Sequence, residues 1–375
     1  MRLWIAAGGT GGHVYPALAV VERIGDPGLG FRDQASGNER SEILWIGGQG
    51  GVEEALVTRA GIPFVAIPAG GLHGVVLISA MRNLTKLIAG TFRSLRLISR
   101  YQPDVMFTTG GFVSAPVAVA CRLRRVPIVV YLPDIEPGRA VKFVAKFAAR
   151  IGVTTEDSAK YFPAKKVVVA GYPTRAELAT ADRAAAIRHF ELEPDRKTLL
   201  IFGGSKGARS INRAASSILE ALLAKYQVIH ISGSTDAEET RTRRESLAED
   251  LKPRYHLFEY VHEMGLALAA ADLVVSRAGA SVLGEYPLFG LPSILIAYPY
   301  AWRYQRVNAD YLVSRGAAVR LDDATLKDTL LPEIDRLLGD EAAWQRMRTA
   351  ARSLARPDAA ARLADVIQSV AGARA

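Results

Sequence analysis

The chain has 375 residues, which is long for one hydrophobic core, so two domains are expected. Its formal net charge of +9 indicates an anionic partner. No run of about 18 apolar residues lacks a polar break, so we expect no membrane-spanning helix, and the first residues do not follow the order of a secretory signal. The single cysteine, Cys121, excludes an internal disulfide and a cysteine-based metal site and predicts a reducing cytoplasm.

Short apolar runs alternate with helical segments along the whole chain. Most of these runs are apolar on both faces and end in Gly, Ser, Pro or Asp, which is typical of parallel strands covered by helices. We therefore expect an α/β fold with two Rossmann-like domains, 1–172 and 173–355, whose parallel sheets face each other across a cleft, and a helix at about 356–375 that packs back on the first domain. The predicted strands are 3–6, 42–48, 64–69, 104–111, 127–133 and 166–173 in the first domain, and 198–204, 227–233, 255–261, 272–279, 293–299 and 317–323 in the second.

The first glycine-rich turn, GGTGGH at 8–13, follows a predicted strand and precedes a helical pattern. Glycines let backbone N–H groups approach an anion, so the turn suits a phosphate or a cluster of sugar hydroxyls. It has neither the lysine of a P-loop nor the G-x-G-x-x-G order, and no acidic residue is cleanly placed at the end of the second predicted strand. His13 follows this turn and is a candidate general base, with a structural histidine as the alternative.

The segment between residues 55 and 103 contains no Asp or Glu. Within it, Leu84, Leu87 and Ile88 fall at helical spacing among basic residues. Docking on an anionic membrane is one interpretation, and an ordinary packed helix with a solvated basic face is the other. No nucleic-acid-binding signature appears, so we expect no nucleic-acid partner. The basic residues of the predicted membrane surface are Arg82, Lys86, Arg93 and Arg96.

A second glycine-rich turn, FGGSKGARSIN at 202–212, offers another anion-binding loop with the Ser205 hydroxyl and the charges of Lys206 and Arg209. Further on, small residues at 276–281 open a predicted helix in which Glu285 lies one to two turns inside. A carboxylate there suits the two hydroxyls of a ribose, although a surface charge is the alternative. The amides of Gln305 and Asn308 suit sugar hydroxyls, because an amide both donates and accepts hydrogen bonds.

These motifs together resemble one family. GGTGGHVYPALAV, GGFVSAP, GYPTR, GGSKGARSIN, RAGASVLGE and GLPSILI occur in the order and spacing of the MurG family of GT-B glycosyltransferases, over nearly the whole chain. The resemblance implies a transferase that moves GlcNAc from UDP-GlcNAc to the undecaprenyl-diphosphate-linked muramoyl-pentapeptide, lipid I, to give lipid II. It also implies an enzyme of peptidoglycan synthesis, cell shape and cell division that binds peripherally to the cytoplasmic face of the bacterial inner membrane.

The resemblance also implies roles for individual residues. Glu285 would hold the ribose, Gln305 would contact the GlcNAc hydroxyls, and His13 would act as the base or position the acceptor. The backbone of Val261 would contact uracil, and Arg175 would contact the diphosphate. The implied UDP-GlcNAc-binding residues are Thr10, Gly11, Gly12, Asp134, Arg175, Ser205, Val261, Ala280, Ser281, Val282, Leu283, Gly284, Glu285 and Gln305.

Two places differ from the family pattern. Residues 131–134 read Tyr-Leu-Pro-Asp where the family has His-Glu-Gln-Asn, so that Asp134 replaces an asparagine, and Tyr304 replaces the glutamine before Gln305. A transferase acting on another lipid acceptor, a UDP-sugar 2-epimerase and a non-catalytic binding protein therefore remain alternatives.

The chain contains no Asp-x-Asp pair; the nearest pattern is Asp134-x-Glu136. Without a metal, the leaving diphosphate must be stabilised by backbone N–H groups, helix dipoles and cationic side chains. Residues 203–209, residues 278–282 and Arg175 supply such groups. We expect an inverting, metal-independent displacement with no cofactor other than the donor substrate. His13 is the first candidate base, followed by Asp134 and Glu136.

Overall fold

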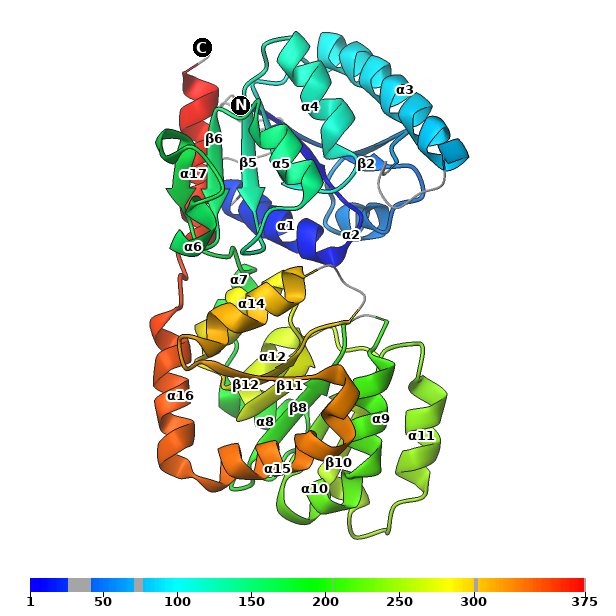
Figure 1. Ribbon diagram of the computed structural model, residues 1–375, viewed down its shortest axis with the longest axis vertical. Helices are drawn as coiled ribbons and strands as arrows, with labels where there is room; N and C mark the ends of the chain where they lie inside the picture. Colours follow the sequence, from blue (N-terminus) through cyan, green and yellow to red (C-terminus); the bar gives the residue numbers. More distant parts are fainter. Residues whose placement is uncertain (26–41, 71–76, 205, 300–302, 374–375) are drawn as a thin grey trace, which may run out of the picture. The chain divides into compact units, whose positions relative to one another are not determined.

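The computed structural model describes residues 1–25, 42–70, 77–204, 206–299 and 303–373, with the backbone alone for 77–82. The chain divides into two compact units, Met1–Arg175 with Arg356–Ala375, and Ala176–Ala355. Each unit contains one sheet of parallel strands covered by helices (Figure 1). The predicted α/β fold with two parallel sheets is confirmed. Among the described residues, no helix is both long and apolar enough to cross a membrane.

The sheet of the first unit has the strand order β3-β2-β1-β4-β5-β6-β7. The order reverses between β1 and β4, and the C-terminal ends of the strands beside such a switch point are where doubly wound sheets bind ligands. β1 pairs with β2 through Leu3↔Ile43 and with β4 through Leu3↔Val105. The strands are β1 (Arg2–Ala7), β2 (Glu42–Gly48), β3 (Phe64–Ile67), β4 (Val105–Gly110), β5 (Ile128–Leu132), β6 (Arg150–Val153) and β7 (Val167–Val169).

Helices cover both faces of this sheet. Buried side chains of α1, α2 and α17 pack on one face, and those of α3, α4 and α5 pack on the other. The C-terminal helix α17 contributes Leu363 and Ile367, both fully buried, to the first of these layers. The helices are α1 (Gly11–Gly25), α2 (Glu53–Arg59), α3 (Leu77–Tyr101), α4 (Ser114–Leu123), α5 (Arg139–Ala145), α6 (Glu156–Ala159) and α17 (Ala359–Gly372).

Strand β6 was not among the predicted strands. It has four residues, and one of them is Gly152, which weakens the sequence signal for a strand. A Cβ atom at Gly152 would lie 2.5 Å from Cδ2 of Leu363. The glycine is therefore explained by the close approach of α17, a helix distant in sequence.

The sheet of the second unit has the order β10-β9-β8-β11-β12-β13, with its switch point between β8 and β11. α9, α10, α15 and Trp344 of α16 bury apolar side chains against one face. The strands are β8 (Thr198–Phe202), β9 (Gln227–Ile231), β10 (Tyr255–Phe258), β11 (Leu273–Arg277), β12 (Ser293–Ile296) and β13 (Ala318–Leu321). The helices are α7 (Ala176–Ala179), α8 (Arg183–His189), α9 (Arg209–Ser217), α10 (Leu219–Lys225), α11 (Ala237–Glu245), α12 (Met264–Ala270), α13 (Glu285–Phe289), α14 (Tyr304–Val313), α15 (Leu326–Gly339) and α16 (Glu341–Ser353).

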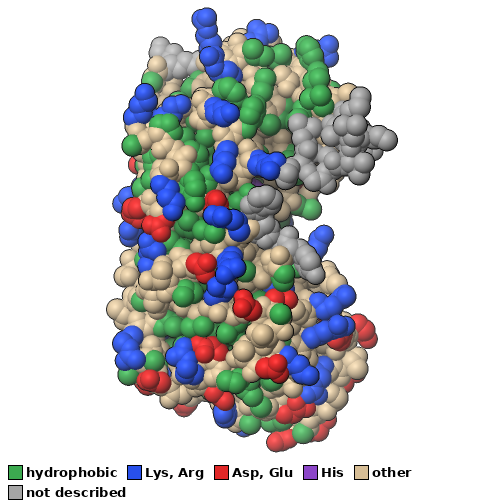
Figure 2. Space-filling view, viewed as in Figure 1, with side chains coloured by type: hydrophobic (Ala, Val, Ile, Leu, Met, Phe, Trp, Pro, Cys, Tyr) green, Lys and Arg blue, Asp and Glu red, His purple; other side chains and the backbone are tan. Residues whose placement is uncertain are grey.

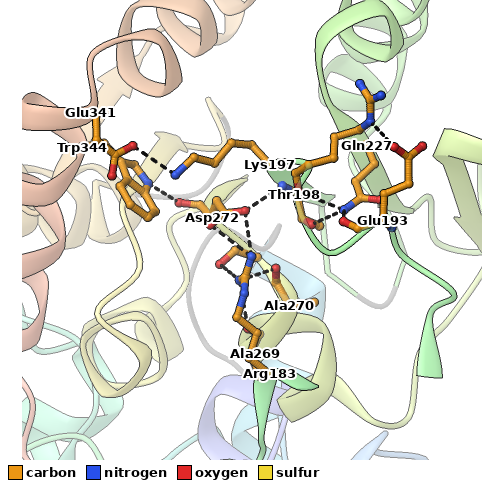
Figure 3. Close-up of polar contacts among 12 residues, drawn as sticks. Arg183, Glu193, Lys197, Thr198, Gln227, Ala269, Ala270, Asp272, Glu341 and Trp344 are labelled. Carbon is orange, nitrogen blue, oxygen red and sulfur yellow. Dashed lines mark hydrogen bonds and ion pairs between the residues drawn. The ribbon is translucent and has the colours of Figure 1, made fainter. Parts of the chain in front are cut away.

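A polar cluster holds the N-terminal ends of β8 and β11 together (Figure 3). The buried carboxylate of Asp272 accepts the Thr198 N–H at 2.8 Å and pairs with Nη2 of Arg183 at 3.1 Å. The backbone carbonyl of Asp272 accepts the indole N–H of Trp344 at 2.8 Å. This cluster lies at the sheet edge opposite the strand ends that bind ligands, so its role is structural.

Candidate functional site

Two glycine-bearing turns meet at the switch point of the first unit. One follows β1 at Gly8, and the other follows β4 at Gly110 and Gly111, whose φ angles are +114° and +89°. A Cβ atom at Gly111 would lie 2.4 Å from the carbonyl oxygen of Gly8, so this close approach requires glycine. The hydroxyl of Thr109 donates to the His13 carbonyl at 2.6 Å. The motifs GGTGGH and GGFVSAP therefore form one structure.

His13 is the third residue of α1 and lies partly buried beside these turns. Its Nδ1 is 3.1 Å from Oγ1 of Thr10, and a Cβ atom at Gly110 would lie 3.1 Å from its Nε2. Burial lowers the pKa of His13, while the carboxylates of Asp134 and Glu53 oppose part of that shift. The imidazole is therefore neutral at pH 7, the state in which it can accept a proton.

Glu53 is a site residue that the sequence analysis missed. It begins α2, yet its carboxylate reaches back to the end of β2, where it accepts the N–H of Gly48 at 2.8 Å. It also accepts the N–H of Gly9 at 3.1 Å. The expectation that no acidic residue is placed at the end of the second strand is therefore wrong, because the intervening glycine turn folds Glu53 onto that end.

The segment that differs from the family pattern begins in the core. Tyr131 is fully buried in β5, and its hydroxyl lies 2.8 Å from Oγ1 of Thr154 and donates to the Gly171 carbonyl at 2.9 Å. Burial raises the pKa of Tyr131 well above its ordinary value, so it is neutral. Asp134 and Glu136 follow in the partly buried loop between β5 and α5, and Asp134 is near enough to His13 to affect its pKa.

The second glycine turn joins β8 to α9 at the switch point of the second unit. Gly204 and Gly207 have φ angles of +97° and +83°, and a Cβ atom at Gly207 would lie 2.1 Å from the carbonyl oxygen of Ser232. Lys206 is exposed within this turn. Ser205, the predicted hydroxyl donor to the diphosphate, lies outside the described residues.

Arg209, the other predicted cation of this turn, has a partner in the second unit. Its Nε lies 2.9 Å from Oδ1 of Asp236, whose side chain is buried. Asp236 also accepts a hydrogen bond from Nδ2 of Asn212 at 2.9 Å. Part of the positive charge predicted for the ligand is therefore already matched by Asp236.

Asn212 extends this network into the core. Its Nδ2 donates to the Ser232 carbonyl at 2.8 Å, and its Oδ1 lies 3.0 Å from Nε2 of His230. Burial lowers the pKa of His230 to about 4, so the ring is neutral at pH 7. Its Nε2–H therefore donates to Asn212, and its Nδ1 accepts from the Tyr255 hydroxyl at 2.7 Å.

The loop after β11 differs from the predicted single helix. Ala280–Leu283 forms a 3₁₀ turn, and α13 begins separately at Glu285. Gly284 separates the 3₁₀ turn from α13, because its φ of −126° and ψ of −46° are not helical. Glu285 is therefore the first residue of a short helix rather than one to two turns inside a longer one.

Gln305 and Asn308 lie in α14, but they have different environments. Gln305 is partly buried, and its Oε1 accepts the N–H of Tyr298 at 2.9 Å, which directs its amide nitrogen away from that bond. Asn308 is fully buried and donates to the Ala278 carbonyl at 3.3 Å, so it supports the loop after β11. A cavity of about 740 Å³ opens beside Tyr298 and Pro299.

Arg277, at the end of β11, was not singled out from the sequence. Its guanidinium pairs with Asp323 at 2.5 Å and donates to Oγ of Ser210 at 2.8 Å. It also lies 5.3 Å from the ring centroid of Tyr298. Arg277 thus links α9, the end of β11 and the loop after β12 within the second unit.

Arg175 and Val261 are the two remaining residues that the resemblance predicts to contact the donor. Arg175 is partly buried, and its Cζ lies 5.0 Å from the ring centroid of Tyr15 in α1. Val261 is buried just after β10.

Helix α3 has an apolar face that the core does not use. Its buried side includes Ser94 and Ile98, whereas Leu84, Ile88 and Phe92, spaced four residues apart, have 50%, 50% and 62% of their surface exposed. Lys86, Arg93 and Arg96 are exposed on the same helix, and the side chain of Arg82 lies outside the described ones. In Figure 2, Lys and Arg side chains lie among hydrophobic ones over the first unit.

Two doubly wound parallel sheets, each with a glycine-rich turn at its switch point, form a GT-B fold, and the family models identify the chain as a glycosyltransferase. Residues 3–153 match the N-terminal domain of glycosyltransferase family 28, and residues 198–363 match its C-terminal domain. Within that class, the chain belongs to the MurG family, because its relatives of that family are similar over its full length.

One relative, from Roseiflexus sp. (strain RS-1), is 42% identical, and the match covers 99% of this chain and 95% of the relative. It is named UDP-N-acetylglucosamine--N-acetylmuramyl-(pentapeptide) pyrophosphoryl-undecaprenol N-acetylglucosamine transferase. A relative of the same name from Halalkalibacterium halodurans is 34% identical over 99% of this chain and 100% of its own. The crystal structure of MurG from Acinetobacter baumannii shares the fold, with a TM-score of 0.76, 24% identity, and coverage of 98% of this chain and 99% of that one.

Proposed function

We propose that this chain transfers N-acetylglucosamine from UDP-GlcNAc to lipid I, the undecaprenyl-diphosphate-linked muramoyl-pentapeptide, and so forms lipid II for peptidoglycan synthesis. The observation that carries this proposal is the match to relatives of that name over 99% of the chain. The same match favours transfer to lipid I over transfer to a different lipid acceptor. It also favours a transferase over a UDP-sugar 2-epimerase and over a non-catalytic binding protein.

The donor site of this proposal lies mainly on the second unit. The glycine turn after β8 and the 3₁₀ turn Ala280–Leu283 after β11 are both at the switch point, where backbone N–H groups can bind a diphosphate. Glu285 would bind the ribose hydroxyls, and the amide nitrogen of Gln305 would donate to the GlcNAc hydroxyls. The backbone of Val261 would contact uracil. Ser205, Lys206 and Arg175 would complete the diphosphate contacts.

The acceptor site of this proposal lies on the first unit. Thr10 and the first two residues of α1, Gly11 and Gly12, would bind the acceptor and the donor diphosphate. His13 is placed at the same turn and is neutral at pH 7, which supports it as the base. Asp134 and Glu136 are second choices, since both belong to the partly buried loop after β5 rather than to the turn itself, and of the two only Asp134 acts on the pKa of His13.

The proposed reaction is an inverting displacement. His13 removes the proton of the acceptor hydroxyl, the oxygen attacks the anomeric carbon of GlcNAc, and the bond between that carbon and the diphosphate oxygen breaks. UDP leaves with the electron pair, and the developing charge on its diphosphate is stabilised by backbone N–H groups and by cations such as Lys206. The reaction is proposed to need no metal ion.

The exposed apolar line of α3 supports a membrane-bound acceptor. Leu84, Ile88 and Phe92 are not used by the core, and the basic side chains beside them suit anionic head groups. We propose that Arg82, Lys86, Arg93 and Arg96 bind the cytoplasmic face of the inner membrane, where lipid I is reached.

A UDP-release assay with a soluble lipid I analogue tests the proposed reaction. The proposal predicts that UDP is released only when both UDP-GlcNAc and the analogue are present. Formation of the 2-epimer without the analogue would instead indicate an epimerase, and no turnover would indicate a binding protein.

A matched pair of variants tests the donor site. Glu285→Ala should weaken UDP binding by roughly 1 to 3 kcal/mol in calorimetry, since it removes hydrogen bonds to a charged group. Glu249→Ala removes an exposed carboxylate of the same unit and should leave UDP affinity unchanged. Equal affinity of both variants would contradict the role of Glu285.

A further inference from the structure

Glu53 is a buried carboxylate whose hydrogen-bond partners are backbone groups. Only 2% of its surface is exposed. Oε2 accepts the N–H of Gly9 at 3.1 Å, and Oε1 accepts the N–H of Gly48 at 2.8 Å. Within the described part of the chain, no Lys, Arg or His side chain forms an ion pair with it. One carboxylate therefore joins the turn after β1 to the end of β2.

The glycines around Glu53 are explained by this carboxylate. A Cβ atom at Gly8 would lie 2.3 Å from Oε1, and a Cβ atom at Gly51 would lie 2.4 Å from the same oxygen. Any larger residue at either position would displace Glu53. Part of the glycine content of the two turns thus makes room for a protein carboxylate rather than for a ligand.

A neutral acceptor would be enough to hold a backbone N–H group. A buried carboxylate without a cation carries a desolvation penalty that a glutamine does not. The charge of Glu53 does act on one neighbour, since the carboxylates of Glu53 and Asp134 both raise the pKa of His13 against the effect of burial. Among the residues that the structure describes, these are the two charged groups that act on the pKa of His13, one from α2 and the other from the loop after β5.

We infer that Glu53 is a positioning residue for the proposed transfer: it fixes the turn from which α1 and His13 begin, and it places a negative charge near that histidine. This inference rests on the proposed function. Glu53 does not touch the substrate and takes no proton. When the acceptor hydroxyl gives its proton to His13, the imidazole becomes positively charged, and the Glu53 carboxylate favours that charge. The turn geometry sets where His13 meets the acceptor.

Three variants separate the two effects. Glu53→Gln keeps the shape but removes the charge and one acceptor, so kcat/KM should fall by roughly 100-fold. The acidic limb of its pH–rate profile should move to lower pH, because His13 loses an anion that favours its protonated form. Glu53→Asp keeps the charge but is too short to reach both turns, so kcat should fall while the limb stays in place. Glu54→Gln removes an exposed charge from the same helix turn and should behave as wild type.

Two readouts do not depend on turnover. NMR titration of labelled His13 should give a lower pKa in Glu53→Gln than in wild type or Glu54→Gln, and amide exchange at Gly9 should be faster in Glu53→Gln. If Glu53→Gln does not fold, the same two measurements on Glu53→Asp decide. In that variant, amide exchange at Gly9 should be faster than in wild type, and the pKa of His13 should be unchanged.

The inference would be overturned if Glu53→Gln matched wild type in its kinetics, in the titration of His13 and in amide exchange at Gly9. Wild-type Gly9 exchange in Glu53→Asp would overturn it as well. If wild type and Glu54→Gln both fail to release UDP, the proposed function fails instead, while the titration and exchange still decide whether Glu53 sets the turn and the charge near His13.

Discussion

Acid should destabilise the second unit through His230. Burial lowers the pKa of this histidine from 6.5 to about 4 in the folded chain. The unfolded chain therefore binds a proton at higher pH than the folded chain does, and stability is lost as the pH falls from about 6.5 towards 4. Between about pH 7.5 and pH 5, linkage with these two pKa values gives a loss of about 2 kcal/mol from this one group.

The loss of unfolding free energy between the two pH values can be assigned to His230 by comparing two variants with wild type. Urea titrations at both pH values, followed by hydrogen exchange of peptides from β8 and β9, report the unfolding free energy of the second unit. His230→Gln should reduce the loss of stability between the two pH values by about 2 kcal/mol, whatever its effect at neutral pH. His189→Gln, which replaces an exposed histidine of α8, should keep the wild-type pH dependence. The same pH dependence in His230→Gln and wild type would refute the assignment.

Asp272, Tyr131 and the basic residues of α3 can each be tested by substitution. Asp272→Ala should lower the unfolding free energy of the second unit by about 3 kcal/mol in urea, because it leaves the Thr198 N–H without its acceptor and Arg183 without its carboxylate partner. Glu341→Gln, which breaks the exposed pair with Lys197, should cost less than about 1 kcal/mol, and equal losses would refute this. Tyr131→Phe should cost about 1 to 3 kcal/mol by leaving the Gly171 carbonyl unpaired, with UDP affinity unchanged; a loss of transfer without a loss of stability would instead place Tyr131 in the chemistry. Replacing Arg82, Lys86, Arg93 and Arg96 by glutamine should weaken binding to anionic vesicles by roughly 1 kcal/mol per charge, measured by sedimentation. The same change at Arg188, Arg213, Arg241 and Arg336 should leave vesicle binding unchanged. Equal vesicle binding by both variants would contradict the membrane proposal.

Most of the fold could be predicted because buried parallel strands are continuous apolar runs. Each predicted run overlaps a strand of the structure. β6 could not be predicted in this way, since it is short and its Gly152 is required by α17, a contact between segments about 200 residues apart. The break at Gly284 was missed for a related reason: small residues before Glu285 continue a helical pattern, and only the backbone conformation ends it.

The site was less predictable because its parts come from separate βα units. The glycine turns were visible as patterns, and the strand order brings each to a switch point. Glu53 was missed because it lies five residues beyond β2 and returns through a glycine turn. Its signal was the run of glycines that precedes it, Gly47, Gly48, Gly50 and Gly51. Arg209 and Asn308 could not be separated from ligand contacts by sequence, since their partners Asp236 and Ala278 lie about 30 residues away.

A crystal structure with bound UDP-GlcNAc tests the central claim most directly. The account predicts the diphosphate at the turns after β8 and β11, with the Glu285 carboxylate on the ribose hydroxyls. A nucleotide bound elsewhere on the second unit, with Glu285 free of the ribose, would contradict it.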